Sequence, residues 1–356
     1  MKNAAGVKKG KVTMKDIAKR LDISQNTVSL ALRNIPTIKK ETREEILRMA
    51  DELGYVYNES GAQTGFAPAG GKVQTQQNIC IFTDSSYFST FYFYTELKTF
   101  LESRLNSLGY GLIVESMFNP RMTREQLGTF CQINSIKGII ILGDMAYEQI
   151  HLVFDLDIPV VTSGFYFCDR FTDCVMEDNL SAIHNAVYRL YERGYRKIGF
   201  LGNVSLGVGQ RERYMGFQAA LDALGLERRP EWVLTDCAAD TETLFHDQKR
   251  YLQAHPALPE VFLCGCDQIA ICVMEAAQDL GLRIPDDIGL VGFDNIDLTL
   301  NVQPRLTTLD PGNAAQADLI VSTLTDRIGG GKAPLRRQIV EVTWIEGGSI
   351  RPAQEK

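Results

Sequence analysis

Between residues 13 and 42 the sequence places side chains whose chemistry suits double-stranded DNA. Gln25 and Asn26 carry amides that can each form paired hydrogen bonds with adenine in the major groove, and Leu30 can contact a thymine methyl group. Hydroxyl and guanidinium groups nearby can bind phosphate oxygens, which fixes the register of a protein on a duplex. These phosphate-contact candidates are Thr13, Ser24, Thr27, Ser29, Arg33 and Thr42.

Three short amphipathic helices are needed to hold these side chains outward. Thr13 can cap the first helix, with Asp16 in capping-box spacing, and Ser24 is an N-cap candidate for the second. A third helix is predicted over about 42–53. The inward positions are Ile17, Ala18, Leu21, Val28, Ala31, Leu32, Ile46, Met49, Ala50 and Leu53. Because helices this short are too small to form a stable enzyme, we interpret the unit as a DNA-binding head.

Charge is divided unevenly along the chain. The 356 residues have a net charge of -7, but residues 1–48 hold twelve Lys or Arg against five acidic residues, or +7, which leaves -14 for the rest. A basic end on an acidic body is typical of a protein that contacts nucleic acid at one end only. No apolar run approaches the length of about 18 residues that a membrane span needs, and the N-terminus lacks the apolar centre of a signal peptide. We therefore expect a cytoplasmic protein without membrane contact.

The rest of the chain alternates short apolar runs with helical patterns, which is typical of a parallel sheet with crossover helices. Residues 59–77 are rich in Gly, Ala, Gln and Thr and predict a linker. A first lobe is expected to have strands near 79–83, 111–115, 138–142, 160–162 and 174–176 and helices around 91–108, 123–134, 146–155 and 180–193. A second is expected to have strands near 197–201, 232–235, 261–264, 288–292 and about 339–343 and helices near 210–224, 241–254, 267–280 and 312–328.

The head resembles the helix-turn-helix of the LacI/GalR family of bacterial transcription regulators. The resemblance is carried by V-T-x-x-D-I-A-x-x-L-x-I-S-x-x-T-V-S-x-x-L, then E-T-R-E-x-I and L-G-Y-x-x-N. It continues through the body in Ile158-Pro159-Val160-Val161, Glu177-Asp178-Asn179, Arg193-Gly194-Tyr195-Arg196-Lys197-Ile198, Arg213-Tyr214-Met215-Gly216-Phe217, Ile284-Pro285-Asp286-Asp287-Ile288, Val291-Gly292-Phe293-Asp294 and Pro304-Arg305-Leu306-Thr307-Thr308.

The resemblance implies a three-part organisation. We expect a small all-α helix-turn-helix head over 12–58, a linker or hinge over 59–77, and an α/β body over 78–350. The body would consist of two doubly wound parallel-sheet lobes that resemble periplasmic binding proteins, with an effector in the cleft between them. The family also implies a homodimer.

The hinge departs from the family pattern. Family members push a leucine from this segment into the minor groove, but the matching position here is Thr64, and Gly61 weakens the would-be helix by about 1 kcal/mol relative to Ala. Phe66, two residues later, could take over as an apolar wedge. A phenylalanine without a fixed place in a linker is the alternative.

The resemblance also implies which residues bind the effector. Arg213 matches a family arginine whose planar guanidinium group binds effector hydroxyls or carboxylates. Asp294 matches an acidic residue at a strand end, and Asp178 matches a third polar position. A helix cap or a structural ion pair is the alternative for each. Phe93 and Tyr94 are candidates for the aromatic wall. Cys266 stands where many family members have Asn, so the family's sugar identity does not carry over.

An enzyme is the main alternative from another class, and the sequence gives it little support. Residues 329–332 lack the spacing of a Walker A loop, the glycines at 202, 207 and 209 do not form G-x-G-x-x-G, and we find no G-x-S-x-G. The histidines form no cluster for a metal or a nucleophile; they are His151, His184, His246 and His255. An architectural DNA binder is a third class, but it would leave the large body unexplained.

The cysteines predict reduced thiols. The eight of them show no tight framework. Cys264 and Cys266 form a lone C-x-C, which more often marks two strand residues than a metal site.

The sequence as a whole thus predicts a DNA-binding transcription regulator and not an enzyme. We expect a repressor controlled by a small effector, a carbohydrate or a derivative of one, with an effector-dependent activator as the alternative. Dimer symmetry would require a near-palindromic operator. We expect no cofactor and no metal.

Overall fold

The computed structural model describes residues 14–21, 23–24, 27–28, 42, 45–46, 48–49, 77–83, 92–116, 123–166, 170–255 and 257–352. The chain separates into two compact units, 1–73 and 74–356. The division falls within the predicted linker. Among the described residues, no helix is both long and apolar enough to span a membrane.

The first unit has a small helical core. Helix α1 (Met14–Leu21) buries Ile17 and Ala18, and Val28 and Ile46 are also buried, as the apolar spacing predicts. Ser24 Oγ accepts the backbone N–H of Thr27 at 3.0 Å, which is the predicted N-cap geometry. Several residues singled out for DNA contacts lie outside the described residues; they are Thr13, Gln25, Asn26, Ser29, Leu30, Arg33, Thr64 and Phe66.

The second unit begins with a sheet of six parallel strands. These strands are β1 (Asn78–Thr83), β2 (Gly111–Ser116), β3 (Ile136–Leu142), β4 (Val160–Ser163), β5 (Asp173–Glu177) and β11 (Arg337–Val340). Their order across the sheet is β11-β5-β4-β3-β1-β2. The four inner strands β1, β3, β4 and β5 are largely buried, as the continuous apolar run 139–142 predicts for a parallel sheet covered by helices, whereas most residues of the edge strands β2 and β11 are half-buried or exposed.

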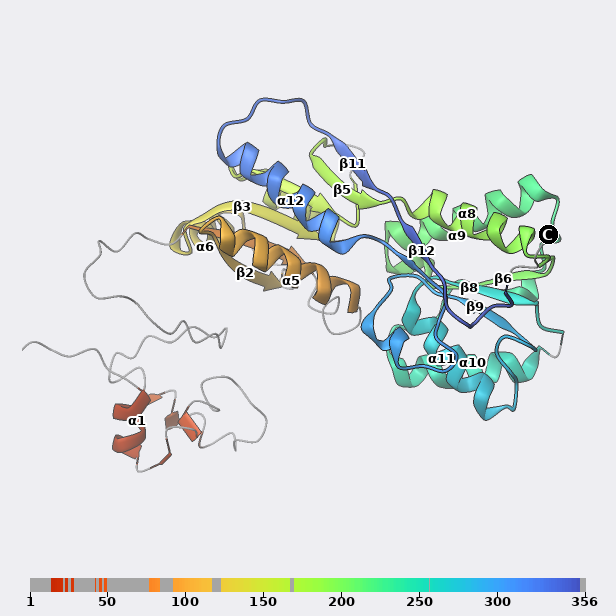
Figure 1. The fold of residues 1–356 in the computed structure, drawn as a ribbon. Helices are drawn as coiled ribbons and strands as arrows, with labels where there is room; N and C mark the ends of the chain where they lie inside the picture. Colours follow the sequence, from red (N-terminus) through yellow and green to blue (C-terminus); the bar gives the residue numbers. More distant parts are fainter. Residues whose placement is uncertain are drawn as a thin grey trace, which may run out of the picture. The chain divides into compact units, whose positions relative to one another are not determined.

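Helices cover both faces of this sheet and complete the first lobe. They are α5 (Tyr92–Ser107), α6 (Arg124–Ile133), α7 (Tyr147–Phe154) and α12 (Asn313–Ile328). One face packs against α5 and α12, which lie side by side (Figure 1), and the other against α6 and α7. Alternate strand residues therefore enter different cores, with Ile81 on the α5 side and Phe82 on the α6 side.

A second lobe repeats the arrangement on a smaller sheet. Its strands are β6 (Ile198–Leu201), β7 (Val233–Leu234), β8 (Val261–Cys264) and β9 (Gly289–Val291), which are parallel in the order β7-β6-β8-β9. Its helices are α8 (Asn179–Glu192), α9 (Val208–Leu224), α10 (Thr241–Ala254) and α11 (Asp267–Asp279). Helices α8 and α9 cover one face, and α10 and α11 cover the other. Both lobes are thus doubly wound, as expected.

The chain passes between the lobes three times. It crosses after β5, after β10 (Thr308–Asp310) and after β11, before β12 (Thr343–Ile345). Strands β10 and β12 pair antiparallel, and Leu309 and Trp344 pack in the core of the second lobe. Figure 1 shows α12 and β11, in the late blue part of the chain, within the first lobe.

Three elements lie in a different lobe from the predicted one. Helix α8, expected in the first lobe, packs in the second, whereas α12 and β11, expected in the second, belong to the first. The predicted strand 339–343 is in fact two, because β11 ends at Val340 and β12 starts at Thr343 in another sheet. The physical reasons are that α12 buries an apolar stripe beside α5, and that β5 pairs with β11 at its outer edge. The other predicted boundaries in the second unit lie within two residues of the observed ones.

Candidate functional site

A small cavity lies between the two lobes, at the carboxyl ends of their strands. Its volume is about 50 Å³. From the first lobe, the cavity is lined by the first turn of α5, the last residue of β5, and residues that closely follow β3 and β4. From the second lobe, it is lined by residues before and in the first turns of α9 and by a residue shortly after β9. The lining residues are Phe93, Tyr94, Asp144, Gly164, Glu177, Leu206, Gly207, Gly209, Gln210, Arg213 and Asp294. This is where a doubly wound fold binds ligands.

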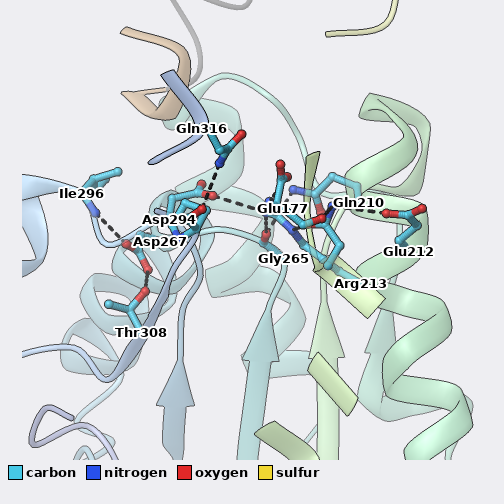
Figure 2. A network of polar contacts seen from close by, with 12 residues as sticks. Glu177, Gln210, Glu212, Arg213, Gly265, Asp267, Asp294, Ile296, Thr308 and Gln316 are labelled. Atoms are coloured by element: carbon cyan, nitrogen blue, oxygen red, sulfur yellow. Dashed lines mark hydrogen bonds and ion pairs between the residues drawn. The ribbon is translucent and has the colours of Figure 1, made fainter. Parts of the chain in front are cut away.

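Arg213 is the centre of a buried polar network (Figure 2). Only 5% of the residue is exposed. Its Nε donates to Asn179 Oδ1 at 2.8 Å, and its Nη1 donates to the carbonyl oxygen of Gly265 at 2.6 Å. The guanidinium carbon lies 3.5 Å from the ring centroid of Phe293, so the planar group also stacks on an aromatic face.

Two carboxylates from different lobes meet the same guanidinium. Glu177 Oε1 lies 3.3 Å from Nη2, and Asp294 Oδ1 lies 3.4 Å from Nη1. Glu177 ends β5 in the first lobe, whereas Asp294 follows β9 in the second. The network therefore joins the lobes through charge.

Asp294 is held in an unusual state. Its backbone has φ of 110°, a region that residues other than glycine rarely adopt and that occurs mainly at functional sites. Burial raises the pKa of its carboxyl to about 7, with Glu177 adding to the rise and Arg213 opposing it. The carboxyl is thus close to the balance between its two protonation states at neutral pH.

A second buried acid, Asp267, supports the loop that carries Asp294. Its Oδ2 accepts the backbone N–H of Ile296 at 3.0 Å, and its Oδ1 accepts the hydroxyl of Thr308 at 2.5 Å. Burial, and then the charge of Asp294, raise the pKa of Asp267 well above its usual value. A Cβ at Gly292 would meet Asp267 Oδ1, so only glycine leaves room for this carboxylate.

Aromatic side chains form the wall on the side of the first lobe. The rings of Phe93 and Tyr94 are 4.9 Å apart and edge to face. The hydroxyl of Tyr94 approaches Gly164 so closely that a Cβ there would lie 2.9 Å from it, and Gly164 has φ of 85°. Glycine at this position lets the aromatic wall approach the strand ends.

The structure brings together four of the five predicted effector residues. Arg213, Asp294, Phe93 and Tyr94 line the cavity. Asp178 does not, because its side chain caps α8 by accepting the backbone N–H of Ser181 at 3.1 Å. The structure thus shows the helix cap that was the alternative for Asp178, and an effector contact of this residue stays a prediction.

Sequence reasoning missed two cavity residues that are as buried as Arg213 and Asp294. Glu177 is 6% exposed and Gln210 is 9% exposed. Gln210 lies three residues before Arg213 on α9, so helical spacing could have placed both side chains on one face. Glu177 is the last residue of β5, directly before the aspartate that was chosen.

The C-x-C pair is structural. Cys264 ends β8, as predicted, but Cys266 is the N-cap residue of α11 and not a strand residue. Burial raises the pKa of both thiols, which keeps them protonated. Within the described ranges, no group of three or more His, Cys, Asp or Glu residues is placed to hold a metal ion.

Two family models match the chain. The model for bacterial regulatory proteins of the lacI family matches residues 13–58, and the model for a periplasmic binding protein-like domain matches residues 187–350. Together they cover the head and much of the body.

Individual proteins match over nearly the full length. The ribose operon repressor of Haemophilus influenzae is 26% identical over 339 residues, which cover 95% of this chain and 98% of the relative. The HTH-type transcriptional repressor CytR of Escherichia coli K12 is 25% identical over 349 residues, with coverages of 95% and 96%. The structure of the lac repressor dimer bound to operator and the anti-inducer ONPF has a TM-score of 0.66 at 19% identity and covers 96% of this chain and 99% of that one.

Proposed function

Because the chain belongs to the LacI family of bacterial regulatory proteins, we propose that it is a homodimeric repressor that binds a near-palindromic operator under the control of a small effector. The chain is a DNA-binding regulator of transcription, and its relatives are regulators rather than enzymes. One observation supports effector control above the others. The ion pair of Arg213 with Glu177 connects the two lobes beside a cavity, and Asp294 of the second lobe pairs with the same guanidinium.

On the DNA side, the head is responsible for sequence recognition. Gln25, Asn26 and Leu30 face the bases of the major groove, while Thr64 and Phe66 of the linker approach the minor groove. The phosphate contacts come from Thr13, Ser24, Thr27, Ser29, Arg33 and Thr42. A regulator that binds chromosomal DNA acts in the cytoplasm, and we place the protein there.

On the effector side, a carbohydrate or a derivative binds between the lobes. A cavity of about 50 Å³ is far smaller than the about 300–1,000 Å³ of typical ligand sites, so binding must change how the lobes meet. The change is transmitted to the paired heads and alters operator affinity. The coupling is reciprocal, because an effector that weakens operator binding must itself bind less tightly when operator is present.

Selection of bound duplexes from a random DNA library by the full chain, at fixed salt near physiological, tests the regulator. We expect one near-palindromic site to be enriched, with half-sites spaced for a symmetric dimer. Enrichment of no site, or of an asymmetric single half-site, would contradict a dimeric operator-binding repressor.

Variants of the head test which residues read sequence. Gln25→Ala and Asn26→Ala should change the preferred bases, because each removes an amide from the base edges. Arg33→Ala is the matched control, since loss of a phosphate contact should weaken all DNA alike and reduce the salt slope by about 1. The same preferred site from all three variants would remove the readout role of the amides.

A further inference from the structure

Two buried oxygen atoms at the cavity are acceptors in need of a donor. Glu177 Oε2 and Gln210 Oε1 have no hydrogen-bond partner within the part of the chain that the structure describes. The amide of Gln210 is oriented by its Nε2, which donates to the carbonyl oxygen of Gly265 at 3.1 Å, so the opposite atom is the acceptor. A buried acceptor left unpaired costs about 1–3 kcal/mol. Both residues line the cavity, so a ligand there can supply the missing N–H or O–H groups.

Arg213 has little donor capacity left for a ligand. Its Nε, both hydrogens of Nη1 and one hydrogen of Nη2 are engaged by Asn179, Gly265, Asp294 and Glu177. A guanidinium has five N–H groups, so one remains. Phe293 covers one face of the group. The arginine therefore holds the two carboxylates in place rather than presenting a free fork to an anionic ligand.

Negative charge predominates around the cavity. Among the described lining residues, Glu177, Asp294 and Asp144 stand beside a single arginine, Arg213, and Asp144 is already paired with Arg211 at 3.2 Å. That leaves two buried carboxyl groups against one guanidinium, and a cation bound beside them would favour the ionised form of Asp294, whose pKa is raised to about 7. The chain segments 84–91 and 167–169, which adjoin the wall in sequence, contain no Lys or Arg.

Acidic residues just outside the cavity also make the site more favourable for a cation than for an anion. The pKa of Asp294 is raised mainly by burial and further by Glu177 and Glu96. The pKa of Glu212, which accepts a hydrogen bond from Asn179 Nδ2 at 3.3 Å, is also raised by burial. In such a poorly solvated site an added anion is strongly disfavoured and a cation is favoured.

We propose that the effector carries a protonated amine, as in an amino sugar, which binds at Glu177 Oε2 and Gln210 Oε1. This inference rests on the proposed function, because it specifies the effector class of the same site. An ammonium group has three donors and no acceptor, so it matches a carboxylate oxygen and an amide oxygen that both need a donor, and its charge offsets that of a carboxylate. A hydroxyl can satisfy the hydrogen bonds but not the charge. Phe93 and Tyr94 suit the apolar faces of a sugar ring and attract a nearby cation.

Matched ligand pairs test the charge. We would measure binding to the full chain by calorimetry and thermal shift near neutral pH, comparing glucosamine with glucose, galactosamine with galactose and mannosamine with mannose. Glucuronate and glucose 6-phosphate serve as anionic probes. At least one amino sugar should bind at least about tenfold more tightly than its hydroxyl partner, and the anions should not bind. Neutral sugars that bind as tightly as the amines, binding of an anion, or no binding by any amine would overturn the proposal.

Neighbouring variants locate the amine. Glu177→Gln keeps the shape and removes the charge, so affinity for the amino sugar should fall at least about tenfold further than affinity for its neutral partner. Asp178→Asn is the matched control, because that side chain caps α8 and does not line the cavity. Should Glu177→Gln fail to fold, the same ligand pairs are compared on the unaltered chain at rising pH, and the preference for the amino sugar should vanish once its ammonium group is deprotonated. Equal losses for amine and neutral ligand would contradict an ammonium at this place.

The outcome is separable from that of the proposed function. Operator selection is carried out without ligand. A palindromic site found for a protein that binds no amino sugar would support the proposed regulator and contradict the proposed amine effector. Binding of an amino sugar without enrichment of any DNA site would support the amine effector and contradict the operator-binding repressor.

Discussion

Arg213 Nη2 lies 3.3 Å from Glu177 Oε1, and this ion pair joins α9 of the second lobe to the end of β5 in the first. Both side chains are almost fully buried. In such surroundings the desolvation of two charges is compensated only while both are present and hydrogen-bonded. The pair thus holds the lobes together, and removal of Arg213 leaves the buried carboxylate of Glu177 without this cation.

Removing the guanidinium should be strongly destabilising. Arg213→Met keeps the length of the side chain but leaves Glu177 and Asp294 buried without a cation, so we expect a loss of about 3–5 kcal/mol in the free energy of unfolding. Urea denaturation measures it. Arg250→Met is the control, because the ion pair of Arg250 with Asp247 is exposed and its loss should lie within the error of the measurement. A similar small effect for both would mean that the buried network contributes no stability.

The contribution of Asp294 to the stability of the protein should fall as the pH rises through the acidic range. Burial raises the folded-state pKa of Asp294 to about 7, whereas an unfolded aspartate has a pKa of about 4. Between these values the folded protein holds a proton that the unfolded chain has released, so the contribution of Asp294 to the free energy of unfolding decreases from about pH 4 to about pH 7 and is flat above. Asp294→Asn should reduce that slope in urea denaturations at several pH values.

A surface aspartate provides the comparison for this slope. The hydrogen bond from Arg283 lowers the pKa of Asp287 to about 2, so its contribution is lost only as the pH falls below about 4. Asp287→Asn should therefore leave the slope between about pH 4 and pH 7 unchanged. If Asp294→Asn also left it unchanged, Asp294 would be ionised in the folded protein throughout this range.

The crossing of α8 and α9 depends on a glycine. A Cβ at Gly216 would lie 2.3 Å from the backbone carbonyl oxygen of Leu180, which cannot move without shifting a helix. Gly216→Ala should therefore destabilise the protein although Ala is the better helix former. Gly128→Ala in α6 is the opposite case, because the nearest atom lies at 4.0 Å, and we expect about 0.4–1 kcal/mol of stabilisation. Thermal unfolding should show a lower melting temperature for Gly216→Ala and a higher one for Gly128→Ala. A higher melting temperature for both variants would contradict the proposed clash at Gly216.

The sequence predicted the positions of the helices and strands better than it predicted the lobe to which each belongs. Apolar periodicity located the strands and helices of the body because each must bury one face or both. It could not assign α12 and β11 to the first lobe, because a buried stripe fits either sheet. At the site, the family pattern pointed to Arg213 and Asp294, but it favoured Asp178 over Glu177, since the turn of the chain after β5 decides which neighbouring acid faces the cavity.

In the head, Ser24 is a helix cap and a candidate phosphate contact, and substitutions can separate the cap from the proposed contact. Its Oγ accepts the backbone N–H of Thr27 at 3.0 Å, which caps the second helix, and its hydroxyl is a candidate phosphate contact. Ser24→Ala should cost about 1 kcal/mol of head stability and weaken DNA binding. Ser24→Asp keeps an equally good cap but adds a negative charge, so it should preserve stability and still weaken binding to all duplexes. Denaturation and DNA titrations of both variants measure the two effects. Full DNA affinity of Ser24→Asp would leave the serine as a helix cap alone.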